Sequence, residues 1–268
     1  MPKPLFSPSV GFFRKDITNI CSVGIIYNSS NPRQVFLDVK NSIYPVKIFR
    51  NMLCPIGGNW IGEDAKADRN TRDTFLRELE EELSLDKKII STAEAGLLGM
   101  KPERESYQVA PTDVPPTDED RKALQDLKQA IKDQALPFRD YENIIPNSVL
   151  LSADPESRRE TLHVLSSYWL VPLPQKEWFE LAHLQSIYGN LSNESVTWVI
   201  SLPVIIKGKH YISWGHDRVF KSFFLCHGLS EAKSLPLVRG IESIELGPPL
   251  SSYAEYNARY RVLNKPAD

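Results

Sequence analysis

Three glutamates on one predicted helix are the residues of this sequence best placed to do chemistry. Glu78, Glu81 and Glu82 lie three and four positions apart, the spacing that brings side chains together on a helix surface. Carboxylates crowded in this way repel one another, and each pair destabilises the helix by about a few tenths of a kcal/mol. A hard divalent cation such as Mg²⁺ would offset that repulsion, because it prefers oxygen ligands and shares its other positions with water and substrate phosphates. The pattern therefore suits metal-assisted chemistry at a phosphoryl group.

The same helix also has an ordinary interpretation as a charged surface helix. Glutamate is a good helix former, and a run such as Arg77–Leu83 is common on solvated faces, so the helix alone favours this reading. Two neighbouring features bear on the choice. Arg77 precedes the acids and can hold one carboxylate by a bidentate pair. Gly57 and Gly58 let the backbone approach a ligand closely.

The segments before the acidic helix predict a strand hairpin and a loop. The apolar run Cys21–Tyr27 and the run Gln34–Asp38 flank a cluster of turn residues, which is typical of two paired strands. Residues 44–52 predict another strand, which leads into a loop at 54–58 marked by Pro and Gly. Three residues can cap the helix: Asp68, Asn70 and Thr71. Its inward face is predicted by Phe75, Leu76, Leu79 and Leu83.

Further strands and helices are predicted beyond the acidic helix. The strand-like runs are Lys88–Leu98, Leu162–Val171 and Val196–Leu202, with 204–206 as a continuation of the last. The helix-like runs are Thr117–Leu136, Lys176–His183 and Asp217–Cys226. We interpret residues 101–158 as an insertion rather than a separate domain, because 101–140 is polar and has too few apolar residues for a core of its own.

This order of elements, with the acid pattern on the helix, resembles the Nudix hydrolase family. The family's box reads Arg-Glu, an aliphatic residue, any residue, Glu-Glu, any residue, Gly and an aliphatic residue. Its counterparts here are Arg77, Glu78, Leu79, Glu81, Glu82 and Leu85. Downstream, Leu162–Val171 resembles the family's later central strand. Glu194 and the pair Trp198-Val199 resemble the acidic residue and the Trp-Val pair before the family's last helix. Gly215-His216-Asp217 resembles the start of that helix. The resemblance covers roughly residues 20–228, apart from the insertion.

The sequence departs from the family pattern in three places. Ser84 stands where the family has the glycine that ends the helix, which is a modest cost. The segment from Gly58 to Arg77 is longer by about five residues, a change that surface loops tolerate. The family's glutamate before the arginine is replaced by Arg69, and Glu63 or Asp64 would substitute for it if the longer loop folds back.

The resemblance implies an α/β/α sandwich, with a mixed sheet and one large insertion. Its domain would span 18–230, between an irregular segment 1–17 and a C-terminal extension 231–268 packed on it. Glu78, Glu81 and Glu82 would bind Mg²⁺ or Mn²⁺ together with the carbonyl of Gly58. Arg77 would orient one of the carboxylates. The general base is not fixed by the box, and its candidates are Glu160, Glu177 and Glu180.

The activity implied is hydrolysis of a phosphoanhydride in a nucleoside diphosphate linked to another group. Gly57, Gly58 and Trp60 would contact this nucleotide-type substrate; for Trp60 the alternative, given equal weight, is a loop anchor packed on the sheet. The rival hypothesis is a Nudix-like module that binds a nucleotide or a protein partner without turnover. The long insertion favours the module, and the intact set of acids favours the enzyme.

Composition and residue spacing limit the partners, metal sites and cellular location that we expect for the protein. A net charge of −2 over 268 residues gives no basic field for nucleic acid or acidic membranes, and no DNA-binding element is evident. No apolar run has transmembrane length. Cys21, Cys54 and Cys226 have no metal-ligand spacing, so we expect free thiols, two of them buried, and a cytoplasmic location. The five histidines lack zinc-site spacing, and a homodimer is left open.

Overall fold

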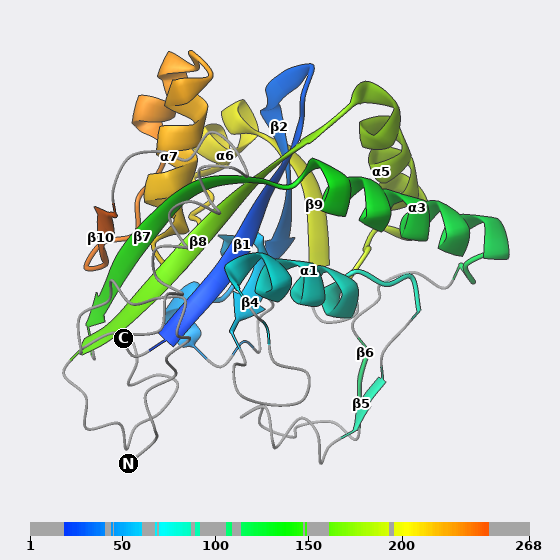
Figure 1. The fold of residues 1–268 in the computed structure, drawn as a ribbon, viewed down its shortest axis with the longest axis horizontal. Coiled ribbons are helices and arrows are strands. Elements are labelled where there is room, and N and C mark those ends of the chain that lie inside the picture. The colour runs from blue at the N-terminus through cyan, green and yellow to red at the C-terminus, as the bar shows by residue number, and fades with distance from the viewer. Residues whose placement is uncertain are drawn as a thin grey trace, which may run out of the picture.

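Eight strands form one mixed sheet with helices on both of its faces (Figure 1). This computed structural model describes residues 19–40, 44, 46–60, 68, 70–86, 89–91, 106–108, 114–146, 148, 161–192 and 196–246. The sheet strands are β1 (Asn19–Asn28), β2 (Asn31–Val39), β3 (Leu53–Cys54), β4 (Ile56–Asn59), β7 (Leu136–Pro146), β8 (Thr161–Leu173), β9 (Val196–Ser201) and β10 (Glu242–Glu245). Two short strands, β5 (Ile89–Ser91) and β6 (Ser106–Gln108), pair separately.

The helices are α1 (Thr71–Glu82), α3 (Asp118–Gln134), α5 (Gln175–Tyr188), α6 (Leu202–Gly208) and α7 (His216–Cys226), with 3-10 turns η2 (Lys47–Phe49) and η3 (Ser230–Ser234). The strand order is β10-β7-β8-β1-β2-β3, while β4 also pairs with β1 and β9 with β2. Strands β1 and β8 run parallel along their whole length, and the other pairings in this sheet are antiparallel. The expected mixed α/β class is therefore confirmed.

Alternation along the central strand β1 creates the two helical layers. Successive strand side chains point to opposite faces of a sheet. Ile26 accordingly lies in the core under α1, α3 and α5, whereas Val23 and Ile25 lie in the core under α6 and α7. Figure 1 shows α1, α3 and α5 together on one face and α6 with α7 on the other. Both faces are thus covered, as the predicted sandwich requires.

Helix α1 forms where the acidic pattern predicts it. The side chain of Asn70 caps its start by accepting hydrogen bonds from the backbone N–H groups of Arg72 and Asp73. Its inward face packs closely on β1, because a Cβ on Gly24 would lie 2.3 Å from the Phe75 ring. Leu79 is fully buried in the same core. These contacts fix α1 against the sheet and leave its acidic side facing β4 and Asp68.

Serine at position 84 is compatible with the way α1 ends. The C-cap Leu83 has extended backbone angles, φ −80° and ψ 114°, and Leu83 pairs with Ser192 as an isolated bridge. The backbone N–H of Ser84 donates to the carbonyl of Leu191 at 3.0 Å. Ser84 does not have positive φ. Because the chain leaves the helix in an extended direction, no left-handed residue is needed where the Nudix pattern has glycine.

Two predicted strands are wrong. Residues 44–52 do not form a strand: Lys47–Phe49 is a 3-10 turn, Asn51 has φ 60°, and the buried Phe49 packs against Trp214. Tertiary packing has overridden the β-branched composition there. Residues 204–206 do not continue β9, because helix α6 begins with Pro203 in its first turn. Proline fits the start of a helix, where its missing N–H has no partner in any case.

The described parts of segment 101–158 share the core of the sheet. Its residues 136–146 form β7, which lies inside the sheet between β8 and β10. Helix α3, predicted as a charged surface helix, buries Leu124, Leu127 and Ile131 in the core beneath α1 and α5. The apolar residues of this segment thus complete a shared core instead of forming a separate one. In the C-terminal extension, β10 adds an edge strand beside β7.

We expect Leu127→Ala to destabilise the whole domain. Leu127 is almost completely buried, and truncating a buried leucine typically costs about 2–5 kcal/mol through lost burial and the cavity left behind. Urea unfolding followed by circular dichroism measures the change. Gln125→Ala, at an exposed position of the same helix, is the control and should change stability by less than about 0.5 kcal/mol. A cost for Leu127→Ala as small as the control's would show that α3 is peripheral.

Candidate functional site

Two glycines of β4 bring the sheet close to α1. Strand β4 pairs antiparallel with β1, with Gly58 opposite Ser22 and Gly57 opposite Val23. A Cβ on Gly58 would lie 2.3 Å from the carboxyl carbon of Glu78, so this carboxylate rests directly against the strand. Gly57 has φ +143°, and a Cβ there would meet the Ser22 carbonyl oxygen at 2.1 Å. Glycine is therefore required at 57 by conformation, and at 58 it leaves the space that the Glu78 carboxylate occupies.

Arg77 connects the acidic helix to the strand and to the preceding loop. Its Nη1 lies 2.7 Å from Oε1 of Glu78 and 2.9 Å from Oε2 of Glu81. Its Nη2 donates to the carbonyl oxygen of Asn59 at 2.7 Å, and its Nε contacts Oδ1 of Asp68 at 3.1 Å. Burial alone would lower the pKa of Arg77, but its hydrogen bond to Asp68 and the charge of Glu78 raise that pKa above its ordinary value. The guanidinium is thus fixed in place and always charged.

Asp68 is a site residue that the sequence analysis did not assign to this role. It was considered only as a helix cap, whereas its nearly buried carboxylate binds Arg77 and its carbonyl accepts the Trp60 indole N–H at 2.8 Å. The signal available was an acid nine positions before Arg77. The alternatives, Glu63 and Asp64, lie outside the described residues, as does Arg69.

The Trp60 ring is buried, so the expectation that it contacts a substrate is wrong. Its side chain is only 5% exposed and packs with Ile20 and Leu165. Its indole N–H is already bonded to the carbonyl of Asp68. An indole saturates its one donor and buries its large surface in this way when it anchors a loop. The structure therefore bears out the alternative given for Trp60, a loop anchor packed on the sheet.

The three predicted metal ligands lie along one side of α1 and differ in their environments. Glu78 is 17% and Glu81 54% exposed, and both pair with Arg77. Glu82 is 9% exposed, and its Oε2 accepts from the backbone N–H of Gly57 at 3.4 Å. Among the described residues, no three His, Cys, Asp or Glu side chains converge as a preformed metal site. The structure brings Glu78 and Glu82 to β4, while Glu81 contacts Arg77.

Glu80, the unspecified position of the box, points to a different partner. It forms ion pairs with Lys128 and Lys132 of α3. Burial alone would raise the pKa of Glu80, but hydrogen bonds from Lys132 and Lys128 hold it below its ordinary value. This acid therefore serves the α1–α3 contact. The three consecutive acids therefore have different partners: Glu80 pairs with α3, Glu81 with Arg77, and Glu82 with the backbone of Gly57.

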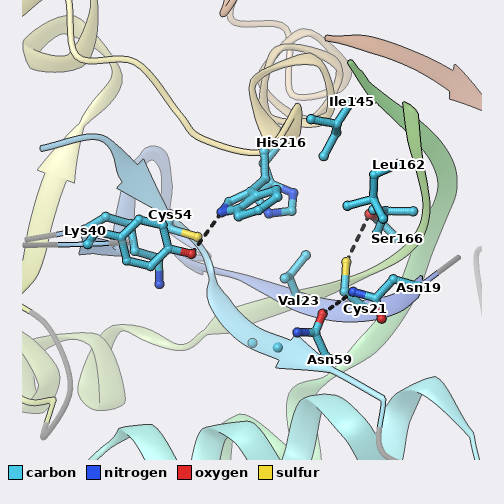
Figure 2. A pocket seen from close by; sticks show the side chains of 15 residues that line it. Asn19, Cys21, Val23, Lys40, Cys54, Asn59, Ile145, Leu162, Ser166 and His216 are labelled. Atoms are coloured by element: carbon cyan, nitrogen blue, oxygen red, sulfur yellow. Dashed lines mark hydrogen bonds between the residues drawn. The ribbon is translucent and has the colours of Figure 1, made fainter. Parts of the chain in front are cut away.

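A cavity of about 170 Å³ opens on the other face of β1 and β4 (Figure 2). Its lining residues are Asn19, Cys21, Val23, Lys40, Tyr44, Cys54, Gly57, Gly58, Asn59, Ile145, Leu162, Val164, Ser166, Trp214 and His216. Gly57, Gly58 and Asn59 thus border the cavity, while Gly58 touches Glu78 and Asn59 binds Arg77 on the helix side. Strand β4, which we call the glycine strand because it contains Gly57 and Gly58, is thus the wall between the α1 carboxylates and the cavity.

The titratable groups around the cavity are buried and strongly perturbed. Burial raises the pKa of Cys21 to about 12 and that of Cys54 to about 11, so both are neutral thiols. Burial lowers the pKa of His216 to about 3, which keeps its imidazole neutral. Lys40 pairs with Asp38 at 2.8 Å, and this carboxylate raises the pKa of Lys40 against the effect of burial. All three cysteines are free, and Cys21 and Cys54 are buried, as predicted.

Neither of the two described candidates for the general base lines the cavity. Glu177 and Glu180 lie on α5, and neither lines the cavity. Glu160 lies outside the described residues, as does Glu194 of the downstream pattern. Tyr168 and Trp169 of β8 are core residues. The base therefore stays unassigned.

We expect Asp68→Asn to loosen the anchoring of Arg77. The substitution removes a nearly buried charge that partners the guanidinium, and breaking a partly buried pair leaves Arg77 undercompensated. The expected loss of stability is about 1–3 kcal/mol, measured by urea unfolding. The control is Asp86→Asn, which weakens the exposed ion pair with Arg121 and should cost less than about 1 kcal/mol. Equal effects in the two variants would argue against the anchoring role.

No family model and no curated protein matches this chain. Within the described residues, no helix is long and apolar enough to cross a membrane. Tests of function must therefore start from the geometry of the glycine strand, the acids on α1 and the cavity.

Proposed function

We propose that this protein is a Nudix-like hydrolase that cleaves the pyrophosphate link of a nucleoside diphosphate attached to another group. The observation that carries the proposal is the contact between the Glu78 carboxylate and Gly58, at the wall of the cavity. This contact brings together the carboxylates of α1, the glycines of β4 and a cavity large enough for a ligand. A strand hairpin, a glycine strand and an acidic helix follow one another in the order that the resemblance predicts.

The residues present suit a divalent cation in their chemistry. Glu78, Glu81 and Glu82 supply hard oxygen donors, and a carboxylate lies against Gly58 only because this residue lacks a Cβ. Glu81 is half exposed, so its carboxylate can turn without unpacking the helix. These three side chains and the Gly58 carbonyl would hold Mg²⁺ or Mn²⁺. When bound, the ion would neutralise developing phosphoryl charge and lower the pKa of a water ligand.

The remaining residues position the reacting groups. Arg77, tied to Asp68 and to the Asn59 carbonyl, sets the rotamers of Glu78 and Glu81. The glycine strand lets a substrate approach the backbone closely. The cavity beyond it accepts the part of the substrate that does not react, so that its binding orients the phosphoanhydride at the acids.

A second candidate function is ligand sensing without turnover. The ion pairs of Arg77 with Glu78 and Glu81 favour it, because they relieve the repulsion between the acids without any cation. On this view the acidic helix is a structural remnant and the cavity alone binds ligand. The two functions differ in whether hydrolysis occurs and in whether it needs the carboxylates.

A hydrolysis panel distinguishes the two functions. ADP-ribose, NADH, diadenosine polyphosphates and nucleotide sugars are incubated with the protein in Mg²⁺ or Mn²⁺, and released products are separated by chromatography. We expect at least one substrate to be cleaved, with loss of at least about a hundredfold in rate in Glu81→Gln. Glu119→Gln, an exposed acid on α3, should retain the wild-type rate. Binding without cleavage in wild type would support the sensor instead.

A further inference from the structure

The wall of the cavity combines apolar side chains with a few hydrogen-bonding groups and has little net charge. Among its described lining residues there is no aspartate or glutamate, and Lys40 is its one cation. Lys40 is neutralised by the buried Asp38 at 2.8 Å, and Glu82 lies close enough to act on it as a second negative charge. A buried anion needs an uncompensated cation beside it. The cavity therefore does not suit a phosphate or carboxylate group.

His216 lines the cavity and is held by a buried hydrogen bond with Tyr168, beside a second buried group of hydrogen bonds at Ser166. It begins helix α7, is 4% exposed, and its Nδ1 lies 2.6 Å from the hydroxyl oxygen of Tyr168. Ser166, which is fully buried, accepts from the Asn143 amide at 2.8 Å and from the Cys21 thiol at 3.0 Å. Figure 2 shows Cys21, Ser166 and His216 around the same hollow.

The tautomer of His216 follows from the direction of its hydrogen bond with Tyr168. Among the described residues, the buried Tyr168 hydroxyl has His216 Nδ1 as its one hydrogen-bond partner, and a buried hydroxyl hydrogen needs an acceptor. The Tyr168 hydroxyl hydrogen then has His216 Nδ1 as its acceptor. Because the imidazole is neutral, the proton of His216 must be on Nε2. Within the described part of the chain, no protein group is bonded to that Nε2.

We propose that His216 is a specificity-determining residue, whose Nε2–H donates to an uncharged acceptor atom of a planar heterocyclic ligand in this cavity. The proposal rests on the proposed function only in assigning this ring to the substrate; the chemistry of the cavity stands without it. Tyr168 is a positioning residue that fixes the tautomer. A donor that lines a cavity and has no protein partner selects a ligand that can satisfy it, since a bound ligand without the acceptor leaves it unpaired.

The other walls suit a ring. Tyr44 and Trp214 supply aromatic surfaces, and Ile145, Leu162 and Val164 supply aliphatic ones. The indole N–H of Trp214 is within 3.3 Å of the Tyr44 hydroxyl, which holds these two side chains together. A volume of about 170 Å³ exceeds by roughly tenfold the space that one water needs by the same measure. Mostly apolar walls with a few directed polar groups are typical of small-molecule sites.

The test is binding of uncharged nucleosides in the absence of metal. Adenosine, guanosine, cytidine and uridine are titrated into the full-length protein in EDTA by isothermal calorimetry, beside inorganic phosphate and ribose 5-phosphate. We expect at least one nucleoside to bind and neither phosphate probe to bind to this cavity. Because no metal and no turnover are involved, this binding can be present while hydrolysis is absent, which would overturn the proposed function and leave the cavity assignment standing.

Substitutions then locate the donor. His216→Phe should weaken the nucleoside about tenfold or more, while His216→Gln, whose amide can reach the Nε2 position, should stay within about threefold of wild type. Tyr168→Phe, which frees the tautomer, should fall between the two. Tyr141→Phe, on the same sheet face but outside the cavity lining, is the control. Melting temperatures are measured for each variant, and the Gln and Tyr168 variants carry the comparison if His216→Phe does not fold.

Three outcomes would overturn the proposal. The first is the failure of all four nucleosides to bind up to their solubility limits. The second is binding of the phosphate probes in the cavity in preference to the nucleosides. The third is nucleoside affinity that is the same in wild type and in a folded variant lacking the imidazole donor. Any of these would mean that the unpartnered donor does not define what the cavity accepts.

Discussion

A Gly58→Ala variant is expected to fold but to lose about a hundredfold of its metal-dependent hydrolysis. A methyl group at this position would lie 2.3 Å from the carboxyl carbon of Glu78 and 2.4 and 2.6 Å from its two oxygens. Those atoms are the far end of a flexible side chain, so the carboxylate moves away at little cost to folding. A displacement of about 1 Å in a catalytic group can reduce a rate by about a hundredfold. Steady-state rates on the best substrate of the panel measure the loss.

The comparison that gives this prediction its meaning is with Glu78→Gln. That variant keeps the shape of the side chain and removes its charge, so it should lose activity to a similar degree. A thermal melt should place Gly58→Ala within a few degrees of wild type, which corresponds to about 1 kcal/mol. Unchanged hydrolysis in a folded Gly58→Ala protein would mean that the contact between Glu78 and the glycine strand has no role in the reaction.

The second large effect expected is a loss of stability in mild acid that is caused by His216. Its buried imidazole has a folded-state pKa of about 3, against an ordinary value of 6.5. Below pH 6.5 the unfolded chain takes up a proton that the folded protein excludes, so this contribution is complete above pH 6.5 and declines as the pH falls toward 3. At pH 5 the decline amounts to about 2 kcal/mol, at about 1.4 kcal/mol per pH unit.

Urea unfolding of wild type and His216→Gln at pH 7, 6, 5 and 4 measures this contribution. The variant should lose less stability than wild type between pH 7 and pH 5, by an amount near 2 kcal/mol. Nuclear magnetic resonance provides an independent readout, because the His216 ring signals should not titrate between pH 7.5 and 5. Ring signals that titrate with a midpoint near 6.5 would contradict the buried, neutral assignment.

Local patterns were sufficient to predict the elements that position the acids. The 3.6-residue spacing of Phe75, Leu79 and Leu83 predicted the inward face of α1, and these side chains are buried. The β-branched run at Cys21–Tyr27 predicted β1, which extends to Asn19–Asn28. In such segments one periodicity is dominant and agrees with the tertiary structure. The glycine pair was also recognised as a point of close approach, although not as the surface on which Glu78 rests.

Features that depend on contacts distant in sequence could not be predicted in the same way. The 101–158 segment looks polar because its few apolar residues are spread over an amphipathic helix and a strand, and only docking on α1, α5 and β8 shows that they share a core. The pairing of Asp68 with Arg77 depends on how the loop folds back, which spacing alone does not determine. The same holds for residues 44–52, where packing of Phe49 on Trp214 accompanies a 3-10 turn in place of a strand.

The cavity was outside the reach of sequence reasoning for a related reason. Its walls come from six parts of the chain, and His216 acquires its chemistry only from Tyr168, which is 48 residues away. In the sequence, His216 was noted as part of a helix start and otherwise as an isolated histidine. Isolated histidines are most often structural, and nothing in the order of residues shows that Nδ1 of His216 is bonded to Tyr168 or that its ring lines a cavity.

The most direct test of the acidic site is a titration with Mn²⁺, followed by isothermal calorimetry and by electron paramagnetic resonance of the free ion. We predict one bound ion with a dissociation constant below about 1 mM, weakened at least tenfold in Glu78→Gln and in Glu81→Gln but not in Glu119→Gln. No binding at 5 mM Mn²⁺, or binding that is equally tight in all three variants, would contradict the assignment of these carboxylates to a divalent cation.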